Sequence, residues 1–240
     1  MKKLLIASTS TVHGKSYLEY ILPELKVFFK GVDTILFVPF ARPSGLTHDE
    51  YTDKVRSVFS TINIKVDGLH NYTNPIEALK KAQGIFTGGG NTFVLVNELY
   101  KRNILDTLRD VVEKGVPYFG TSAGSNITGI TMMNTNDMPI VYPPSFATLG
   151  FLNFNLNPHY LDPDPNSTHM GETRETRIKE YHCFNPIPVL GLREGSWIAV
   201  DGDKISLKGK LKARLFLKGK EPVELDSGSD LSTIEYVHLI

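Results

Sequence analysis

Residues 116–126 read VPYFGTSAGSN, an apolar strand pattern that runs directly into the motif G-x-S-x-G. Ser122 is the central residue of that motif, and small residues surround it. A serine on a sharp turn between a strand and a helix is held in a strained conformation and projects into a cleft. The N–H of the next residue, Ala123, would lie at a helix N-terminus and could stabilise an oxyanion. The stretch predicts a nucleophile turn; the alternative is an ordinary turn in which Ser122 caps the helix.

Short apolar runs alternate with helical patterns on both sides of this turn. Strands are expected at residues 4–7, 34–39, 62–66, 84–87 and 116–120. Helices are expected at residues 16–29, with a break at Pro23, and at 47–60, 74–82, 93–100 and 104–114. This rhythm is typical of an α/β fold with a mostly parallel sheet flanked by helices. Ligands of such sheets bind at the carboxyl ends of the strands, where the loops at 87–92 and 120–126 both lie.

The pattern changes after residue 126. Residues 137–144 and 151–157 read as strands or extended loops, 159–170 as a polar loop and 171–181 as a charged helix. Short strands follow from residue 189, and the turn sequences DGD at 201–203 and KGK at 218–220 indicate hairpins. We expect one α/β domain over residues 1–240 with a β-rich C-terminal third.

The composition excludes several classes of protein. Lys plus Arg and Asp plus Glu both number 26, so a nucleic-acid partner bound through a broad basic surface is not expected. The single cysteine, Cys183, can form neither an internal disulfide nor a cysteine-based zinc site. The N-terminal apolar run is too short for a signal peptide, and no stretch approaches the roughly 20 apolar residues of a membrane span. We expect a cytoplasmic protein, monomer or homodimer, with no membrane partner.

A serine nucleophile needs a base, and seven histidines are available. His159 is the best candidate, because it follows an apolar stretch and the sequence NP at 157–158 and opens an irregular loop. The alternative for His159 is a surface loop residue. His169 and His182 lie in or beside the charged helix and are expected to be solvated, and His238 lies near the C-terminus.

The base in turn needs a carboxylate that orients it. Glu194 follows an apolar strand pattern and precedes a glycine, so it is well placed to reach a cleft. Asp137 is the rival, and for either residue the alternative is an exposed acid in a turn. Sequence spacing does not decide between the two.

Residues 86–92, FTGGGNT, place three glycines at the end of an expected strand. Glycines let backbone N–H groups converge on an anion, as in a phosphate nest or half of an oxyanion hole. The sequence lacks G-x-G-x-x-G and a P-loop lysine, so the oxyanion role is favoured over nucleotide binding. A tight turn is the alternative. The alternating charges around Arg174 are typical of a solvated helix face and assign it no function by themselves.

Five segments in this order resemble the α-aspartyl dipeptidases of the S51 family of serine peptidases. They are FTGGGNT at 86–92, GTSAGSN at 120–126, NPH at 157–159, GETRETRI at 171–178 and GLREGSW at 191–197. The resemblance covers nearly the whole chain. It implies a fold related to class I glutamine amidotransferases, with a serine in the nucleophile position and neither a metal nor an organic cofactor.

The resemblance also implies a catalytic triad. Ser122 matches the nucleophile, His159 the base and Glu194 the acid that orients the base. Asp137 matches an aspartate that has also been proposed to matter in this family, and it is kept as a secondary candidate.

The resemblance further implies how a substrate is held. Gly89 and Ala123 match the backbone donors of the oxyanion hole. Arg174 matches an arginine that holds the side-chain carboxylate of an N-terminal aspartate. The implied substrates are small Asp-Xaa dipeptides with a free amino terminus. The loop at 160–170 departs from the family's pattern and would border the specificity pocket.

Two other functions stay open. A cyanophycinase-like peptidase would share the triad but cut β-aspartyl linkages to arginine, and Asp162 and Asp164 could then bind that arginine. A non-catalytic protein would use the glycine loop and Arg174 to bind an anionic metabolite, with Ser122 as a simple hydrogen-bonding group.

Overall fold

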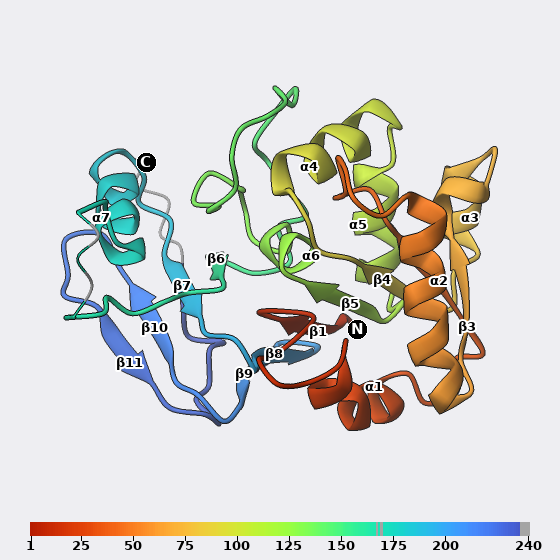
Figure 1. The fold of residues 1–240 in the computed structure, drawn as a ribbon, viewed down its shortest axis with the longest axis horizontal. Coiled ribbons are helices and arrows are strands. Elements are labelled where there is room, and N and C mark those ends of the chain that lie inside the picture. Colours follow the sequence, from red (N-terminus) through yellow and green to blue (C-terminus); the bar gives the residue numbers. More distant parts are fainter. Residues whose placement is uncertain (167, 169, 236–240) are drawn as a thin grey trace.

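The computed structural model describes residues 1–166, 168 and 170–235 of the chain. Its central sheet has seven strands in the order β3-β2-β4-β5-β1-β8-β9 (Figure 1). These are β1 (Lys3–Ala7), β2 (Thr34–Val38), β3 (Lys65–Gly68), β4 (Ile85–Thr87), β5 (Tyr118–Thr121), β8 (Ser196–Asp201) and β9 (Lys204–Gly209). The pairs among β1 to β5 are parallel, whereas β8 and β9 extend one edge as antiparallel strands. The predicted mostly parallel sheet is confirmed.

Helices cover both faces of this sheet (Figure 1). On one face, α1 (Leu22–Phe28) and α2 (His48–Phe59) pack against an apolar layer rich in aromatic side chains. On the other face lie α3 (Pro75–Lys80), α4 (Thr92–Lys101), α5 (Leu105–Glu113) and the short α6 (Ala123–Asn126). Within the described residues, 3₁₀ turns lie at Glu19–Ile21, Ser60–Ile62 and Leu69–Asn71.

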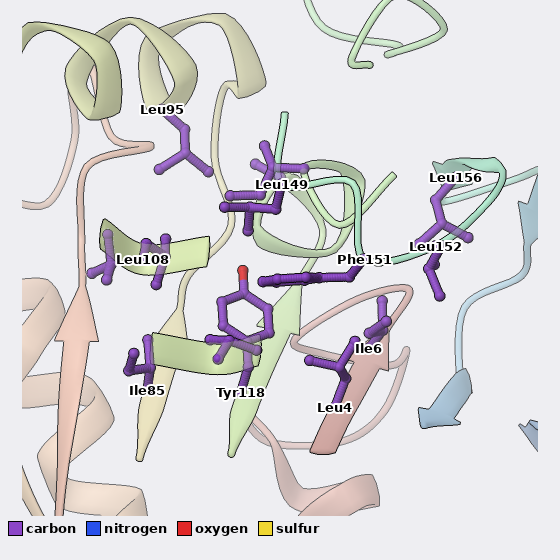
Figure 2. Packing of buried hydrophobic residues seen from close by; sticks show 14 of the residues in the cluster. Leu4, Ile6, Ile85, Leu95, Leu108, Tyr118, Leu149, Phe151, Leu152 and Leu156 are labelled. Carbon is purple, nitrogen blue, oxygen red and sulfur yellow. The ribbon is translucent and has the colours of Figure 1, made fainter. Parts of the chain in front are cut away.

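The side chains of β1 alternate between these two faces, as the two-residue period of a strand requires. Leu4 and Ile6 enter the layer under α3 to α6, and Leu5 and Ala7 enter the layer under α1 and α2. Figure 2 shows the first of these layers, where Tyr118 lies beside Leu4 on the neighbouring strand. Burial on both faces fixes the register of β1 and β5, because a shift of one residue would exchange the two sets.

A second, smaller sheet lies at the opposite end of the view from α2 and α3 (Figure 1). Its strand order is β11-β10-β7-β6, from β6 (Asn155–Pro158), β7 (Val189–Leu192), β10 (Ala213–Phe216) and β11 (Val223–Leu225). Only β6 and β7 pair in parallel in this sheet. Helix α7 (Arg174–Phe184) packs on it through a small apolar cluster that includes Ile178, Val189 and Phe216. The predicted β-rich C-terminal part is therefore confirmed.

Several local predictions can be compared with the structure. Thr47 caps α2 in a capping box with Glu50, as its position suggests. The helix expected at 16–29 is shorter, because Leu18 adopts a φ of 58° and Pro23 occupies the first turn of α1. The strand expected at 62–66 begins later, at Lys65, because Asn63 has a φ of 61°.

The predictions for the C-terminal half can be compared with the structure in the same way. The hairpins at 201–203 and 218–220 are confirmed, since β8 pairs with β9 and β10 with β11 in antiparallel fashion. Residues 137–144 form neither a helix nor a strand. In the part of the chain that the structure describes, no helix is long and apolar enough to cross a membrane.

Candidate active site

Ser122 lies between β5 and α6 with φ 53° and ψ −112°. A positive φ favours glycine and strains a serine, as expected of a nucleophile turn. The two motif glycines are required by close packing. A Cβ on Gly120 would lie 2.5 Å from the carbonyl oxygen of Gly124, and one on Gly124 would lie 2.1 Å from that of Thr87. At this turn β5, β4 and α6 therefore approach each other too closely for a side chain at position 120 or 124.

The predicted base reaches the serine. His159 Nε2 lies 2.9 Å from Ser122 Oγ, and His159 Nδ1 lies 2.6 Å from Glu194 Oε1. A carboxylate only accepts, so Nδ1 donates to Glu194 and leaves Nε2 of the neutral ring free to accept from the serine hydroxyl. The structure thus brings Ser122, His159 and Glu194 into one hydrogen-bonded row.

Asp137 takes a different position. Its Oδ2 accepts from the backbone N–H of Thr92 at 2.7 Å and from the hydroxyl of Thr135 at 3.2 Å. These contacts place the carboxylate at the N-terminus of α4, a favourable place for an anion. Within the described residues Asp137 has no hydrogen bond to His159, so the structure does not bring the rival acid to the base.

One residue that orders this row went unnoticed in the sequence. Ser8, fully buried directly after β1, accepts the backbone N–H of His159 at 2.9 Å and donates to the carbonyl of Leu192 at 2.7 Å. His159 has a φ of 55°, so its backbone also needs support. The sequence signal was a small polar residue ending the strand that pairs with β5, and it is too common to be informative alone.

The glycine loop lies against the serine. A Cβ on Gly89 would lie 2.9 Å from the Cβ of Ser122, so only glycine permits this approach. The Gly89 N–H, however, donates to the buried hydroxyl of Tyr51 at 3.0 Å. In the described part of the chain, the N–H groups of Gly90 and Ala123 have no acceptor. The structure thus brings Gly89 beside Ser122, and nothing in the sequence pointed to Tyr51 as the acceptor of its N–H.

A small cavity of about 170 Å³ opens above Ser122. Its wall includes Ala123, Asp137, His159 and Arg174. Arg174 begins α7, and its guanidinium forms no ion pair with the residues described. Burial lowers the pKa of Arg174, and nearby Arg177 lowers it further while Asp137 opposes both. The structure therefore adds an unpaired, partly buried cation to the serine's pocket, although the charge pattern around Arg174 suggested a solvated face.

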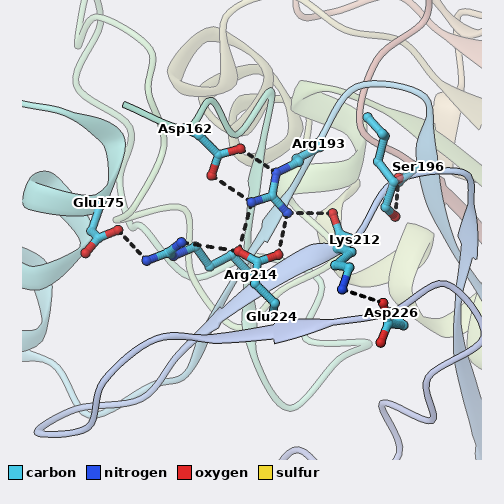
Figure 3. A network of polar contacts seen from close by, with 9 residues as sticks. Asp162, Glu175, Arg193, Ser196, Lys212, Arg214, Glu224 and Asp226 are labelled. Atoms are coloured by element: carbon cyan, nitrogen blue, oxygen red, sulfur yellow. Dashed lines mark hydrogen bonds and ion pairs between the residues drawn. The ribbon is translucent and has the colours of Figure 1, made fainter. Parts of the chain in front are cut away.

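A chain of ion pairs joins Asp162, Arg193, Glu224, Arg214 and Glu175 (Figure 3). Arg193 binds Asp162 through two nitrogens, each at 2.7 Å, and also pairs with Glu224 at 2.8 Å. Arg214 joins Glu224 at 3.2 Å to Glu175 at 2.9 Å. These bonds raise the pKa of Arg193 and hold those of Asp162 and Glu224 below their usual values.

The network joins the segments that carry the site. Arg193 precedes Glu194, Asp162 lies three positions after His159, and Glu175 follows Arg174. The carboxylate of Asp162 is thereby occupied by a protein partner.

One of the other histidines is buried where the sequence predicts a solvated side chain. His182 was expected to be solvated, and this is wrong: it is 7% exposed, and its Nε2 lies 3.0 Å from the carbonyl oxygen of Ile187. The reason is that α7 packs its inner face on the second sheet, a tertiary contact that the charged sequence conceals. His169 and His238 lie outside the described residues.

The chain is similar to known peptidases along nearly its whole length. The family model "Peptidase family S51" matches residues 4–208. "Peptidase E" of Streptomyces coelicolor is 48% identical over 96% of this chain and 94% of its own length. A "Probable alpha-aspartyl dipeptidase" of Drosophila melanogaster is 45% identical over 96% of each chain. In fold, the chain is similar to a peptidase from an acI-B1 Actinobacterium, with a TM-score of 0.72, 17% identity and 96% coverage of both chains. The chain belongs to peptidase family S51 and is a serine peptidase.

Proposed function

We propose that this peptidase hydrolyses Asp-Xaa dipeptides with a free N-terminal aspartate through an acyl-enzyme on Ser122. One observation carries the proposal: Ser122 and His159, which form a hydrogen-bonded row with Glu194, line the same small cavity as Arg174, whose guanidinium has no ion pair within the described residues. The row supplies a nucleophile with its base, and Arg174 supplies a counter-charge for an acidic side chain.

The reaction begins when His159 Nε2 takes the proton of Ser122 as Oγ attacks the carbonyl carbon of the aspartyl residue. Glu194 accepts from Nδ1 and stabilises the imidazolium that forms. His159 then gives the proton to the leaving amine, and the peptide bond breaks. Water, activated by the same histidine, attacks the aspartyl ester and releases aspartate and free Ser122.

The oxyanion of the tetrahedral intermediate needs backbone donors. Ala123, the first residue of α6, offers an N–H that has no acceptor among the described residues. We assign the second donor to the glycine loop, where Gly89 would have to exchange its bond to Tyr51 for the oxyanion. Loss of one such donor typically costs about 2.7–4 kcal/mol of transition-state stabilisation.

Arg174 is proposed to hold the side-chain carboxylate of the substrate. A guanidinium can bind a carboxylate through two parallel hydrogen bonds. An uncharged asparagine in its place would leave a partly buried cation unpaired, so discrimination between Asp and Asn should be large.

The cyanophycinase-like alternative receives less support. It requires free acids to bind the arginine of its substrate, and Asp162 is already paired with Arg193. The binding-protein alternative gives no reason for the row of hydrogen bonds from Glu194 to Ser122.

The test is hydrolysis of Asp-Leu, Asn-Leu and β-Asp-Leu by the full chain and by Arg174→Gln. We expect the wild type to cleave Asp-Leu at least about 100-fold faster than Asn-Leu, which corresponds to about 2.7 kcal/mol. Arg174→Gln should remove most of that ratio by slowing Asp-Leu alone. Preferential cleavage of β-Asp-Leu, or an Asp-to-Asn ratio that survives in Arg174→Gln, would contradict the proposal.

A further inference from the structure

We infer that Asp137 binds the α-ammonium group of the substrate and so makes the free amino terminus a requirement. The inference rests on the proposed function, because it names the subsite that holds the other charge of an N-terminal aspartate. It gives Asp137 a role at the substrate in place of the role beside His159 considered from the sequence.

The contacts of Asp137 leave half of its carboxylate available. Oδ2 accepts from the N–H of Thr92 and the hydroxyl of Thr135. Oδ1 has no partner within the described residues, although Asp137 is partly buried and lies on the cavity wall. The bond to Thr92 therefore fixes the direction of the carboxylate, and one oxygen remains to accept from a ligand.

The charges on the cavity wall fit a zwitterionic end. Asp137 is the acid and Arg174 the permanent cation on the described wall of the cavity. They act on each other electrostatically, yet no ion pair within 4.0 Å joins them. An anion and a cation that line one cavity without touching can receive a group that carries both charges. An N-terminal aspartate has a side-chain carboxylate for Arg174 and, near pH 7, an ammonium for Asp137.

The other roles open to Asp137 do not use its free oxygen. Glu194 already occupies Nδ1 of His159, so orientation of the base needs no second acid. Capping of α4 requires one acceptor for the Thr92 N–H, and Oδ2 supplies it. The place of the carboxylate on the same cavity wall as Ser122 and Arg174 is explained by a ligand that is cationic next to its reacting carbonyl.

The test removes one partner from the enzyme and the other from the ligand. Asp137→Asn keeps an acceptor for the Thr92 N–H but loses the charge. N-succinyl-leucine differs from Asp-Leu only by lacking the amino group. The two ligands are compared by calorimetric binding to the Ser122→Ala protein and by hydrolysis with the serine intact. Asp110→Asn, at an exposed position of α5, is the matched control.

We expect the Ser122→Ala protein to bind Asp-Leu about 100-fold more tightly than N-succinyl-leucine. Adding Asp137→Asn to this protein should weaken the binding of Asp-Leu by about that factor. The affinity for N-succinyl-leucine should change by no more than about threefold. Hydrolysis should show the same asymmetry, and Asp110→Asn should show none.

Equal losses for both ligands would overturn the inference, because a purely structural effect on α4 does not distinguish them. Cleavage of Asp-Leu with no preference for the amino group would overturn the inference, while the acyl-enzyme on Ser122 and the selection of an acidic side chain by Arg174 would stand. Failure of the Ser122→Ala protein to bind Asp-Leu, with no hydrolysis by the wild type, would overturn both.

Discussion

His159 and Glu194 lie 35 positions apart in the sequence, yet His159 Nδ1 is 2.6 Å from Glu194 Oε1. Their proximity follows from the parallel pairing of β6 and β7, in which Pro158 lies opposite Leu192. The segments that follow β6 and β7 leave the second sheet at the same end, next to the carboxyl end of β5 and Ser122. The candidate triad therefore spans two sheets, with the serine on the larger and its two partners on the smaller.

This relationship predicts the effect of removing the Glu194 charge. Glu194→Gln can still reach His159 but no longer stabilises an imidazolium, so kcat for Asp-Leu should fall by about 10³ to 10⁴. KM should change little, since Glu194 does not line the cavity above Ser122. Steady-state kinetics, which gives kcat and KM separately, checks this prediction. A variant that keeps more than a tenth of the wild-type kcat would mean that Glu194 is not the orienting acid.

Ser8 should act through His159 rather than on the substrate. Ser8→Ala leaves the His159 N–H and the Leu192 carbonyl without their shared partner, which costs about 1–3 kcal/mol for each group that stays buried and unsatisfied. We expect a lower kcat with an unchanged KM. A change in stability without any change in kcat would show that Ser8 supports only the fold. Ser57→Ala on the exposed face of α2 is the control.

The ion pairs at Arg193 predict a loss of stability that depends on geometry as well as charge. Arg193→Lys keeps the cation but cannot bind Asp162 through two nitrogens while also reaching Glu224. The free energy of unfolding should fall by about 2 kcal/mol. Urea denaturation measures this value, and Lys15→Ala, which removes an exposed pair with Glu19, should change it much less. Equal effects of the two substitutions would contradict a structural role for the network.

Burial of His182 predicts a pH dependence of stability. Desolvation lowers the pKa of His182 in the folded protein below the ordinary value of 6.5. The unfolded chain therefore binds a proton more readily, and stability falls as the pH drops through 6.5 and towards the folded-state pKa. His182→Gln should flatten the unfolding free energy between about pH 7 and pH 5. His48 has a pKa lowered in the same direction, so a smaller slope should remain. If the unfolding free energy of His182→Gln depended on pH as steeply as that of the wild type, His182 would not be a source of the pH dependence.

The sequence predicts the larger sheet well because its strands are short apolar runs separated by helical patterns. It also predicts the turn at Ser122, because small residues follow an apolar strand pattern there. What it could not predict is which distant segments meet. Spacing left Glu194 and Asp137 equal as partners of His159, and only the pairing of β6 with β7 separates them.

Residues whose role is set by tertiary packing were also missed. Tyr51 and Ser8 are common residue types in ordinary local patterns, and their hydroxyls matter only because the fold places them at Gly89 and His159. Arg174 was a candidate only through the resemblance to the S51 family, because the charge pattern around it is typical of a solvated face, whereas the structure places it on the cavity wall. Local patterns cannot report such contacts, because they arise between elements.

The most direct measurement is turnover of Asp-Leu by the wild type, Ser122→Ala and Ser57→Ala, together with labelling by a serine-reactive phosphonate. The account predicts that Ser122→Ala loses turnover and labelling while keeping the wild-type circular dichroism spectrum, and that Ser57→Ala loses neither. Labelling of the wild type should map to Ser122. Asp-Leu hydrolysis that persists near the wild-type rate in Ser122→Ala would contradict the central claim.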